Sequence, residues 1–413
     1  MERIRTIILC LFIFCTTIGF AQIDTLPIDT AYSFIRINSD TLYWGHDSMN
    51  LVRFYQNLAK VYASKQGNIN IMQIGGSHVQ AGTMSHRIRA NLLTAYGDDP
   101  ASRGMIFPYS AANACNNPHD YKISKSRPFK LTRNVYQHFT TPLGVTGIAV
   151  SCSDTLTTLS VKMNDPQFDF EADTIILLGD TKGWPIDPIL KDDTLVHFPD
   201  AEDTTNDRYY FYLNHLMDNY TFYFPCSKGD TFSITGILLK NSRPGITFHS
   251  IGVNGASVPD YLRCVHFERD LSLIHPDLVI FGIGVNDAFG PNFDSLQFKE
   301  NYLKLIHKIQ KVNPNCAFIF LTNNDTFHSG QRGHYTVNPT GPEVCDVMYR
   351  LANLTGGAVW NQFDIMGGLA SMEKWRQHGL AQYDRVHFTT EGYNLIGDLF
   401  YNAFIHQLQD DLR

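Results

Sequence analysis

Beyond its first 21 residues, the chain lacks any apolar run long enough to cross a membrane, since a spanning helix needs about 20 such residues. Positive charge is also scarce: 33 Lys and Arg are set against 40 Asp and Glu, a formal net charge of −7. A mildly acidic chain has no basic footprint for phosphates, so we expect no nucleic-acid partner. No two cysteines form a Cys-x-x-Cys pair, so the usual signature of a zinc site is missing and we expect no metal.

The N-terminus has the pattern of a secretory signal peptide. Arg3 and Arg5 precede an apolar run over residues 7–15, and small residues lead to Ala21. We predict that residues 1–21 are removed, that the protein is exported to the periplasm or the extracellular space, and that the mature chain has no transmembrane segment. A membrane anchor is the alternative, but the run is short for one. Export leaves open one or two disulfides among the six remaining cysteines, most of which we expect to be buried thiols.

Strands and helices alternate in two separated parts of the chain. Apolar patterns predict strands over residues 68–74, 246–253, 278–283, 317–321 and 358–361. Helical spacing predicts helices over residues 48–65, 79–96, 258–271, 296–312, 343–354 and from Thr389 or Thr390 to about 408. This alternation is typical of a parallel sheet that helices cover on both faces.

The intervening segment has a different character. Residues 98–244 are rich in Asp, Thr, Pro, Gly and aromatics, with short alternating runs at 157–163, 174–178, 220–224 and 231–239. Such runs, separated by turn signals, predict a β-sandwich or jelly roll. We therefore expect a discontinuous α/β domain, residues 22–97 and 245–413, that carries a β-rich domain, residues 98–244, as an insertion.

Four polar or glycine-rich features follow predicted strands or stand before the last helix. They are Gly75-Gly76-Ser77-His78, Gly252-Val253-Asn254-Gly255-Ala256, Gly284-Val285-Asn286-Asp287 and Asp384-Arg385-Val386-His387. In an open α/β sheet, ligands bind beyond the carboxyl ends of the strands, near the point where the strand order reverses. We expect the four features to meet there.

These features supply the parts needed for acyl transfer. A serine hydroxyl needs a base, and His387 is suited to take the proton of Ser77. Asp384, three residues earlier, can hold the imidazole and stabilise its charged form. We expect the backbone N–H groups of Ser77 and Gly255 and the side-chain amide of Asn286 to bind the developing oxyanion.

The four features occur in the order of the four blocks of the SGNH, or GDSL-like, hydrolases, which this chain resembles over residues 50–97 and 245–408. The resemblance implies a serine esterase or acylhydrolase on a flavodoxin-like three-layer α/β/α fold, without a cofactor. It assigns Ser77, Asp384 and His387 to the catalytic triad, and Gly255 and Asn286 to the oxyanion hole. One departure is Gly76, where the family usually has Asp.

A narrower resemblance of architecture is to exported peptidoglycan O-acetylesterases. It rests on His78 directly after the serine, on the Gly-Val-Asn-Gly-Ala form of the second block and on the large β-rich insertion. It implies that the insertion is a carbohydrate-binding-like module.

Several other residues could contact substrate. His78 could touch it or could be an ordinary residue at a helix start, and His328 and His334 could line the cleft or lie on a solvated loop. In the insertion, Phe107, Tyr109 and Trp184 could stack on sugars, but with aromatics at 13% of the chain, core packing is the favoured reading.

The sequence therefore predicts a secreted serine esterase that removes small acyl groups, above all acetyl, from a carbohydrate polymer such as peptidoglycan. Two alternatives stay open at this point. One is an esterase for plant or host glycans or for lipids, and the other is a glycan-binding protein whose active site has been lost.

Overall fold

The structure is a computed structural model that describes residues 24–98, 101–153, 156–180, 186–225 and 229–411. The predicted signal peptide, residues 1–21, lies outside the described residues, as does Trp184. No helix in the described ranges is long and apolar enough to cross a bilayer.

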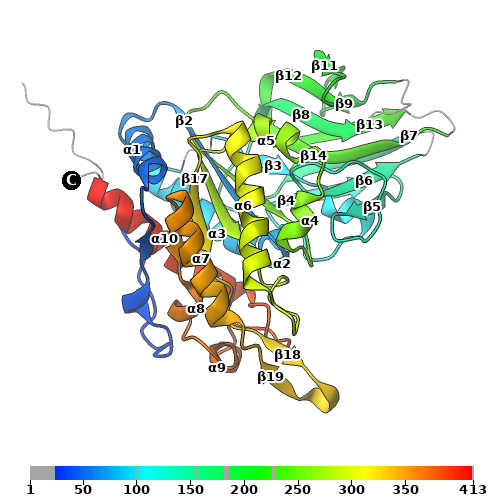
Figure 1. Cartoon of the computed structure of the whole chain (residues 1–413). Helices are drawn as coiled ribbons and strands as arrows, with labels where there is room; N and C mark the ends of the chain where they lie inside the picture. The colour runs from blue at the N-terminus through cyan, green and yellow to red at the C-terminus, as the bar shows by residue number, and fades with distance from the viewer. Residues whose placement is uncertain (1–23, 99–100, 154–155, 181–185, 226–228, 412–413) are drawn as a thin grey trace, which may run out of the picture.

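Six strands form the first sheet, in the order β1-β20-β17-β16-β2-β15. Figure 1 labels β2 and β17 of this sheet. Their bounds are β1 Leu42–Trp44, β2 Asn68–Gly75, β15 Gly245–Gly252, β16 Leu278–Gly282, β17 Ala317–Leu321 and β20 Ala358–Trp360. All pairs are parallel except β1 with β20. Numbered along the chain, the five parallel strands lie in the order 2-1-3-4-5, which is the flavodoxin-like order. The predicted fold class is confirmed.

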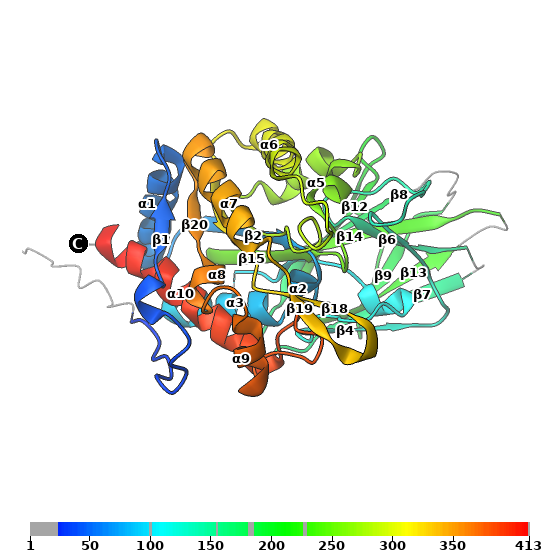
Figure 2. The same ribbon diagram turned by 60° about the horizontal axis from the view of Figure 1, so that its bottom comes forward.

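Helices cover both faces of this sheet. One layer contains α1 Met49–Ser64, α3 Thr83–Tyr96 and α10 Thr390–Asp411, and the other contains α4 Val258–Leu262, α5 Phe267–Ile274, α6 Ser295–Val312 and α7 Gly341–Thr355. Figure 2 shows α6 and α7 on one side of the sheet and α3 and α10 on the other. The short helices α8 Gln362–Ile365 and α9 Ser371–Gln377 and the hairpin β18 Phe327–Ser329 with β19 Tyr335–Val337 lie in the C-terminal part of the chain.

Two predicted helices are interrupted. The helix expected over residues 79–96 consists of α2 Ser77–Gln80 and α3, separated at Gly82, whose φ of 76° cannot continue a right-handed helix. The helix expected over residues 258–271 consists of α4 and α5. The prediction of two continuous helices was therefore wrong.

The segment between β2 and β15 contributes two antiparallel sheets. One has the order β10-β9-β13-β7-β4, and the other has the order β11-β12-β8-β14-β6-β5, with β3 paired to β14. Their bounds are β3 Gly104–Ile106, β4 Tyr121–Lys125, β5 Lys130–Arg133, β6 Ile148–Cys152, β7 Leu156–Met163, β8 Ala172–Asp180, β9 Ile189–Lys191, β10 Val196–His197, β11 Ala201–Asp203, β12 Arg208–Met217, β13 Asn219–Pro225 and β14 Phe232–Lys240. Phe211 and Phe232 of the second sheet contact Phe222 and Phe224 of the first, with ring centroids 5.9 and 4.9 Å apart. The two sheets therefore share an aromatic core, as in a β-sandwich.

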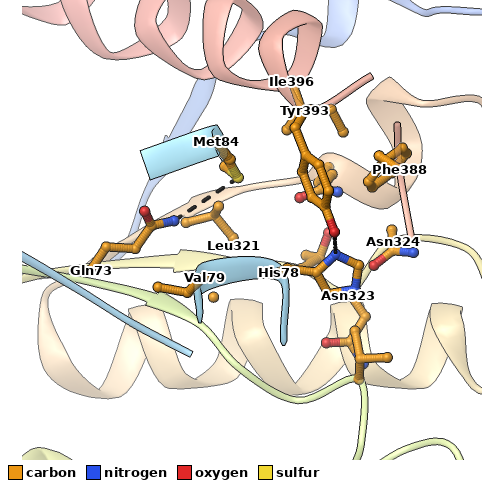
Figure 3. Close-up of a pocket in the computed structure, with 14 residues that line it drawn as sticks. Gln73, His78, Val79, Met84, Leu321, Asn323, Asn324, Phe388, Tyr393 and Ile396 are labelled. Atoms are coloured by element: carbon orange, nitrogen blue, oxygen red, sulfur yellow. Dashed lines mark hydrogen bonds between the residues drawn. The ribbon is translucent and has the colours of Figure 1, made fainter. Parts of the chain in front are cut away.

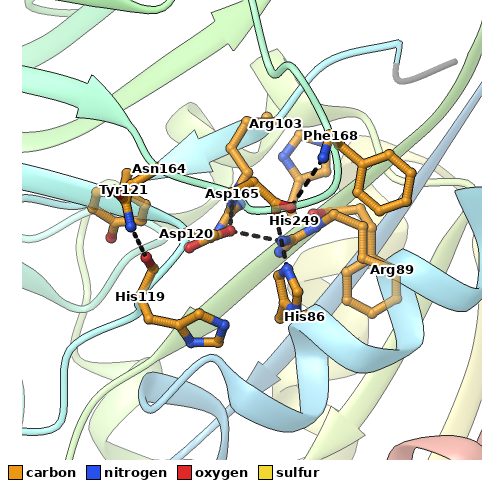
Figure 4. A network of polar contacts seen from close by, with 12 residues as sticks. His86, Arg89, Arg103, His119, Asp120, Tyr121, Asn164, Asp165, Phe168 and His249 are labelled. Atoms are coloured by element: carbon orange, nitrogen blue, oxygen red, sulfur yellow. Dashed lines mark hydrogen bonds and ion pairs between the residues drawn. The ribbon is translucent and has the colours of Figure 1, made fainter. Parts of the chain in front are cut away.

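A buried ion cluster joins the β-rich segment to α3 (Figure 4). Arg89 of α3 and Arg103 both donate to the carboxylate of Asp120, and all three side chains are about 2% exposed. Burial alone would raise the pKa of Asp120, but the two guanidinium groups hold it well below its usual range. Beside them, His86 Nε2 lies 2.7 Å from Asp165 Oδ2.

The cysteines form no disulfide among the described residues. Cys152, Cys264, Cys316 and Cys345 are buried free thiols, and Cys115 is an exposed one. Cys226 lies outside the described residues, as do Cys10 and Cys15 of the predicted signal peptide.

Candidate active site

The strand order places three of the four sequence features side by side. β2 lies between β15 and β16, so the residues that follow these three strands meet at one edge of the sheet, at the reversal of strand order. Ser77 is the first residue of α2, directly after β2 and Gly76. Gly255 follows β15, and Asn286 follows β16.

The fourth feature completes a chain of hydrogen bonds. Ser77 Oγ lies 2.8 Å from His387 Nε2, and His387 Nδ1 lies 2.7 Å from Asp384 Oδ2. An ionised carboxylate accepts the Nδ1 proton, so Nε2 of a neutral His387 is left to accept the proton of Ser77. This is the arrangement of a nucleophile, a base and an orienting carboxylate.

Asp384 is held as a carboxylate by hydrogen bonds. Burial raises its pKa, but the ring of His387 and the backbone N–H groups of His387 and Val386 outweigh burial and lower the pKa to about 2. The same bonds fix the loop that presents His387, because Asp384 Oδ1 accepts both backbone N–H groups at 2.9 and 3.0 Å.

Three residues that line the pocket of Ser77 carry N–H donors. The backbone N–H groups of Ser77 and Gly255 have no acceptor among the described residues, and both residues line the same pocket. Gly255 has a φ of 83°, a left-handed value that favours glycine, although a Cβ there would meet no atom within 4 Å. Asn286 Nδ2 donates to Ala256 O at 2.9 Å, which orients the amide and leaves its second N–H for another acceptor.

Asp287 anchors the loop that carries Asn286. Both of its carboxylate oxygens accept the backbone N–H of Val258, at 3.1 and 3.2 Å. Burial raises the pKa of Asp287 to about 7. Its contacts are with the backbone at the start of α4, so its role is to order the loop.

The serine opens into a pocket of about 520 Å3. The pocket is lined by Ser77, Cys115, Asn116, Asn254, Gly255, Val285, Asn286, Phe289, Gln382, Val386, His387 and Tyr393. Asn116 Nδ2 donates to Ser77 O at 2.9 Å and to Asn254 Oδ1 at 3.0 Å, so the β-rich segment contributes a wall of the site. Sequence reasoning missed Cys115 and Asn116, because they lie in an irregular loop far from any of the four motifs.

His78 is not among the residues that line the 520 Å3 pocket, and Figure 3 shows it next to Tyr393 in a different cavity. Its ring is 5.0 Å from that of His387, and its Nδ1 shares a hydrogen bond of 2.8 Å with Tyr393 OH. Burial, and then the neighbouring His387, lower the pKa of His78 to about 3, so the ring is neutral. It borders a separate cavity of about 30 Å3 that Gln73 and Asn323 also line.

The two other predicted contact histidines also lie outside the pocket lining. His328, in β18, packs its ring 4.7 Å from that of Phe289, which does line the pocket. His334 is exposed and ends the short turn 331–333 before β19. Phe107 and Tyr109 are 2% and 4% exposed, so they are core residues. The prediction that these two aromatic side chains pack in the core is confirmed.

In the part of the chain that the structure describes, no group of three or more His, Cys, Asp or Glu side chains is placed to hold a metal ion. The chemistry that this arrangement can perform with its own groups is nucleophilic attack by Ser77 on an acyl carbon, with proton transfer through His387.

Comparisons with known proteins identify one family match and several similar folds. Residues 235–395 match the GDSL-like lipase/acylhydrolase family. No curated protein matches the sequence. Among solved structures, a peptidoglycan O-acetylesterase is similar, with a TM-score of 0.73, 19% identity, and coverage of 89% of this chain and 99% of that chain. At this identity the similarity shows the fold.

Smaller regions are similar to two other solved structures. An acetyl xylan esterase has a TM-score of 0.31 at 22% identity, covering 38% of this chain and 81% of that chain. A lipase/acylhydrolase from Enterococcus faecalis has a TM-score of 0.31 at 21% identity, covering 39% of this chain and 77% of that chain.

Proposed function

Because this chain is a carboxylic ester hydrolase with a GDSL-like acylhydrolase domain, we propose that it is an exported serine esterase that removes small acyl groups, above all acetyl, from a carbohydrate polymer. The observation that carries the proposal is the hydrogen-bonded chain from Ser77 through His387 to Asp384, in a pocket whose lining residues Ser77 and Gly255 have backbone N–H groups without an acceptor in the described ranges.

In this mechanism His387 Nε2 takes the proton of Ser77 as Oγ attacks the ester carbonyl. The negative charge that develops on the carbonyl oxygen is stabilised by the N–H groups of Ser77 and Gly255 and by the amide of Asn286. Asp384, with its pKa of about 2, stays ionised and stabilises the imidazolium. The alcohol leaves with the proton from His387, and water then repeats the sequence on the acyl-serine to release the acid.

The pocket lining supports a sugar ester over a lipid ester. Amide side chains of Asn116, Asn254, Asn286 and Gln382 are distributed among its apolar residues, and amides suit the hydroxyl groups of a sugar. The similarity in fold to a peptidoglycan O-acetylesterase makes peptidoglycan the first polymer to test.

The test compares wild type with Ser77→Ala on a small acetyl ester, O-acetylated peptidoglycan, acetylated xylan and a long-chain ester. We expect acetate release from at least one acetylated polymer and loss of nearly all activity in Ser77→Ala, since the residual rate without a nucleophile is small. Full activity of Ser77→Ala would refute the mechanism. Preference for the long-chain ester would refute the carbohydrate substrate.

A serine-reactive fluorophosphonate separates the esterase from a glycan-binding protein that has lost its activity. We expect it to label wild type and not Ser77→Ala. All five candidate catalytic positions hold chemically competent residues, which argues against such a loss.

A further inference from the structure

A second groove, of about 560 Å3, lies on the β-rich segment next to the candidate active site. It is lined by Tyr109, Ser110, Asn117, Pro118, Tyr121, Lys122, Ile123, Ser124, Ser160, Lys162 and Asn219. Asn116 lines the pocket of Ser77, and the next two residues, Asn117 and Pro118, line this groove. The loop of residues 116–118 therefore separates the pocket of Ser77 from the groove, and a polymer bound over Ser77 that crosses this loop enters the groove.

The groove contains a pair of lysines in an unfavourable position for stability. β4 and β7 are antiparallel, and Lys122 lies directly opposite Lys162 in their register. Both are exposed, and neither forms an ion pair within the described ranges. Like charges directly opposite each other destabilise a sheet, so the fold gains nothing from this pairing.

Acidic side chains do not offset the two lysines. None lines the groove, and Asp218, next to Asn219, is not among the lining residues. Two acids at the ends of the neighbouring strands are already paired. Asp120, directly before β4, is buried between two arginines, and Asp192, directly after β9, is held by His197 and His215 at 3.0 and 3.2 Å.

Positions next to the groove on this sheet face add a third lysine and a further hydroxyl group. Lys191 of β9 lies opposite Thr221 of β13, and Thr221 Oγ1 lies 2.7 Å from Ser160 Oγ of β7. The whole chain has a formal net charge of −7, whereas the lining of this groove contains lysines and no carboxylate. The local charge of the groove is therefore opposite in sign to that of the chain. Positive charge concentrated beside a binding site attracts an anionic ligand.

We propose that this groove binds carboxylate groups of the polymer that is deacylated at Ser77, so that the substrate is an anionic acylated glycan. The inference rests on the proposed function and narrows its substrate class. Lys122 and Lys162 present two ammonium groups to the carboxylates, while the hydroxyls and amides of Ser124, Ser160 and Asn219 can bind sugar hydroxyls. The carboxylates can belong to a sugar acid of the chain or to a peptide attached to it.

The test uses the double variant Lys122→Gln/Lys162→Gln. The control is Lys60→Gln/Lys304→Gln, which removes two exposed lysines from α1 and α6 and so makes the same change in net charge. Four substrates are compared: 4-nitrophenyl acetate, neutral acetylated xylan, acetylated polygalacturonate with sugar carboxylates, and O-acetylated peptidoglycan with peptide carboxylates.

We expect the groove variant to lose about 3- to 10-fold in kcat/KM, mainly through KM, on one or both anionic polymers. The anionic polymer that shows the loss identifies the source of the carboxylate. The difference from wild type should vanish at about 1 M NaCl, where the Debye length is about 3 Å. Activity on 4-nitrophenyl acetate and on neutral xylan should stay within about twofold of the control variant's, which also shows that the variant is folded.

Three outcomes overturn the inference. If wild type cleaves the anionic polymers and the groove variant cleaves them equally well, the lysines bind no carboxylate and the proposed function stands. If wild type deacetylates only neutral xylan, the substrate is not anionic and the proposed function again stands. If wild type cleaves 4-nitrophenyl acetate but no polymer, the proposed function fails as well.

Discussion

The amide of Asn286 offers the sharpest test of the candidate oxyanion hole. Its Nδ2 is positioned by a 2.9 Å hydrogen bond to Ala256 O, and Asn286 lines the same pocket as Ser77 and Gly255, whose backbone N–H groups have no acceptor among the described residues. Removing one such donor lowers kcat by about 10²- to 10³-fold, or about 2.7–4 kcal/mol. The side chain is exposed, so Asn286→Ala should lower the free energy of unfolding by only about 0.5–1.5 kcal/mol, the value of one hydrogen bond.

These two magnitudes make the experiment decisive. We expect Asn286→Ala to lower kcat on 4-nitrophenyl acetate by at least about 100-fold with little change in KM, because the donor acts on charge that develops in the transition state. Asn286→Asp has nearly the same size but no N–H donor, so its loss should be at least as large. Asn301→Ala, which removes an amide from α6, is the control. If kcat falls less than about tenfold while the protein unfolds at the wild-type urea concentration, Asn286 is not an oxyanion donor.

Two further predictions concern the β-rich segment. Asp120→Ala leaves Arg89 and Arg103 buried without their counter-charge and should lower the free energy of unfolding in urea by about 3–5 kcal/mol. As a control, Asp193→Ala at an exposed position should change this free energy by less than about 0.5 kcal/mol. A loss below about 1 kcal/mol for Asp120→Ala would contradict the role of the cluster. Cys115 is the exposed thiol among the described cysteines, and it lines the pocket of Ser77. A bulky maleimide should therefore block hydrolysis of the polymer by wild type and leave the Cys115→Ser variant active. Equal inhibition of both proteins would mean that the reactive thiol is another cysteine.

The α/β part of the fold could be predicted from local patterns. The continuous apolar run of β17 was expected over residues 317–321, the bounds that the structure shows. The meeting of Ser77, Gly255 and Asn286 follows from general topology, because each residue comes after a parallel strand and loops at one edge converge. Their catalytic roles stay predictions until the variants are measured.

Other features depend on contacts that no local pattern records. The loop with Asn116 reaches Ser77 only because the β-rich segment packs back on the sheet, over a sequence separation of 39 residues. The position of His78 depends on its hydrogen bond to Tyr393, which lies 315 residues further along the chain, so no local pattern could predict it. The break before α3 was missed because Gly82 is compatible with a helical pattern in sequence, while its left-handed φ is visible only in the fold.

Gly76 stands where the SGNH hydrolases that this chain resembles usually have Asp, and the structure gives a physical reason for the small residue. A Cβ at position 76 would lie 3.2 Å from Asn286 Nδ2 and 3.4 Å from Ala256 O. These are the two atoms of the hydrogen bond that orients the Asn286 amide. An acidic side chain at position 76 would therefore require this bond to shift. Because Gly76 has no side chain, the amide of Asn286 can approach its backbone closely and keep its hydrogen bond to Ala256 O.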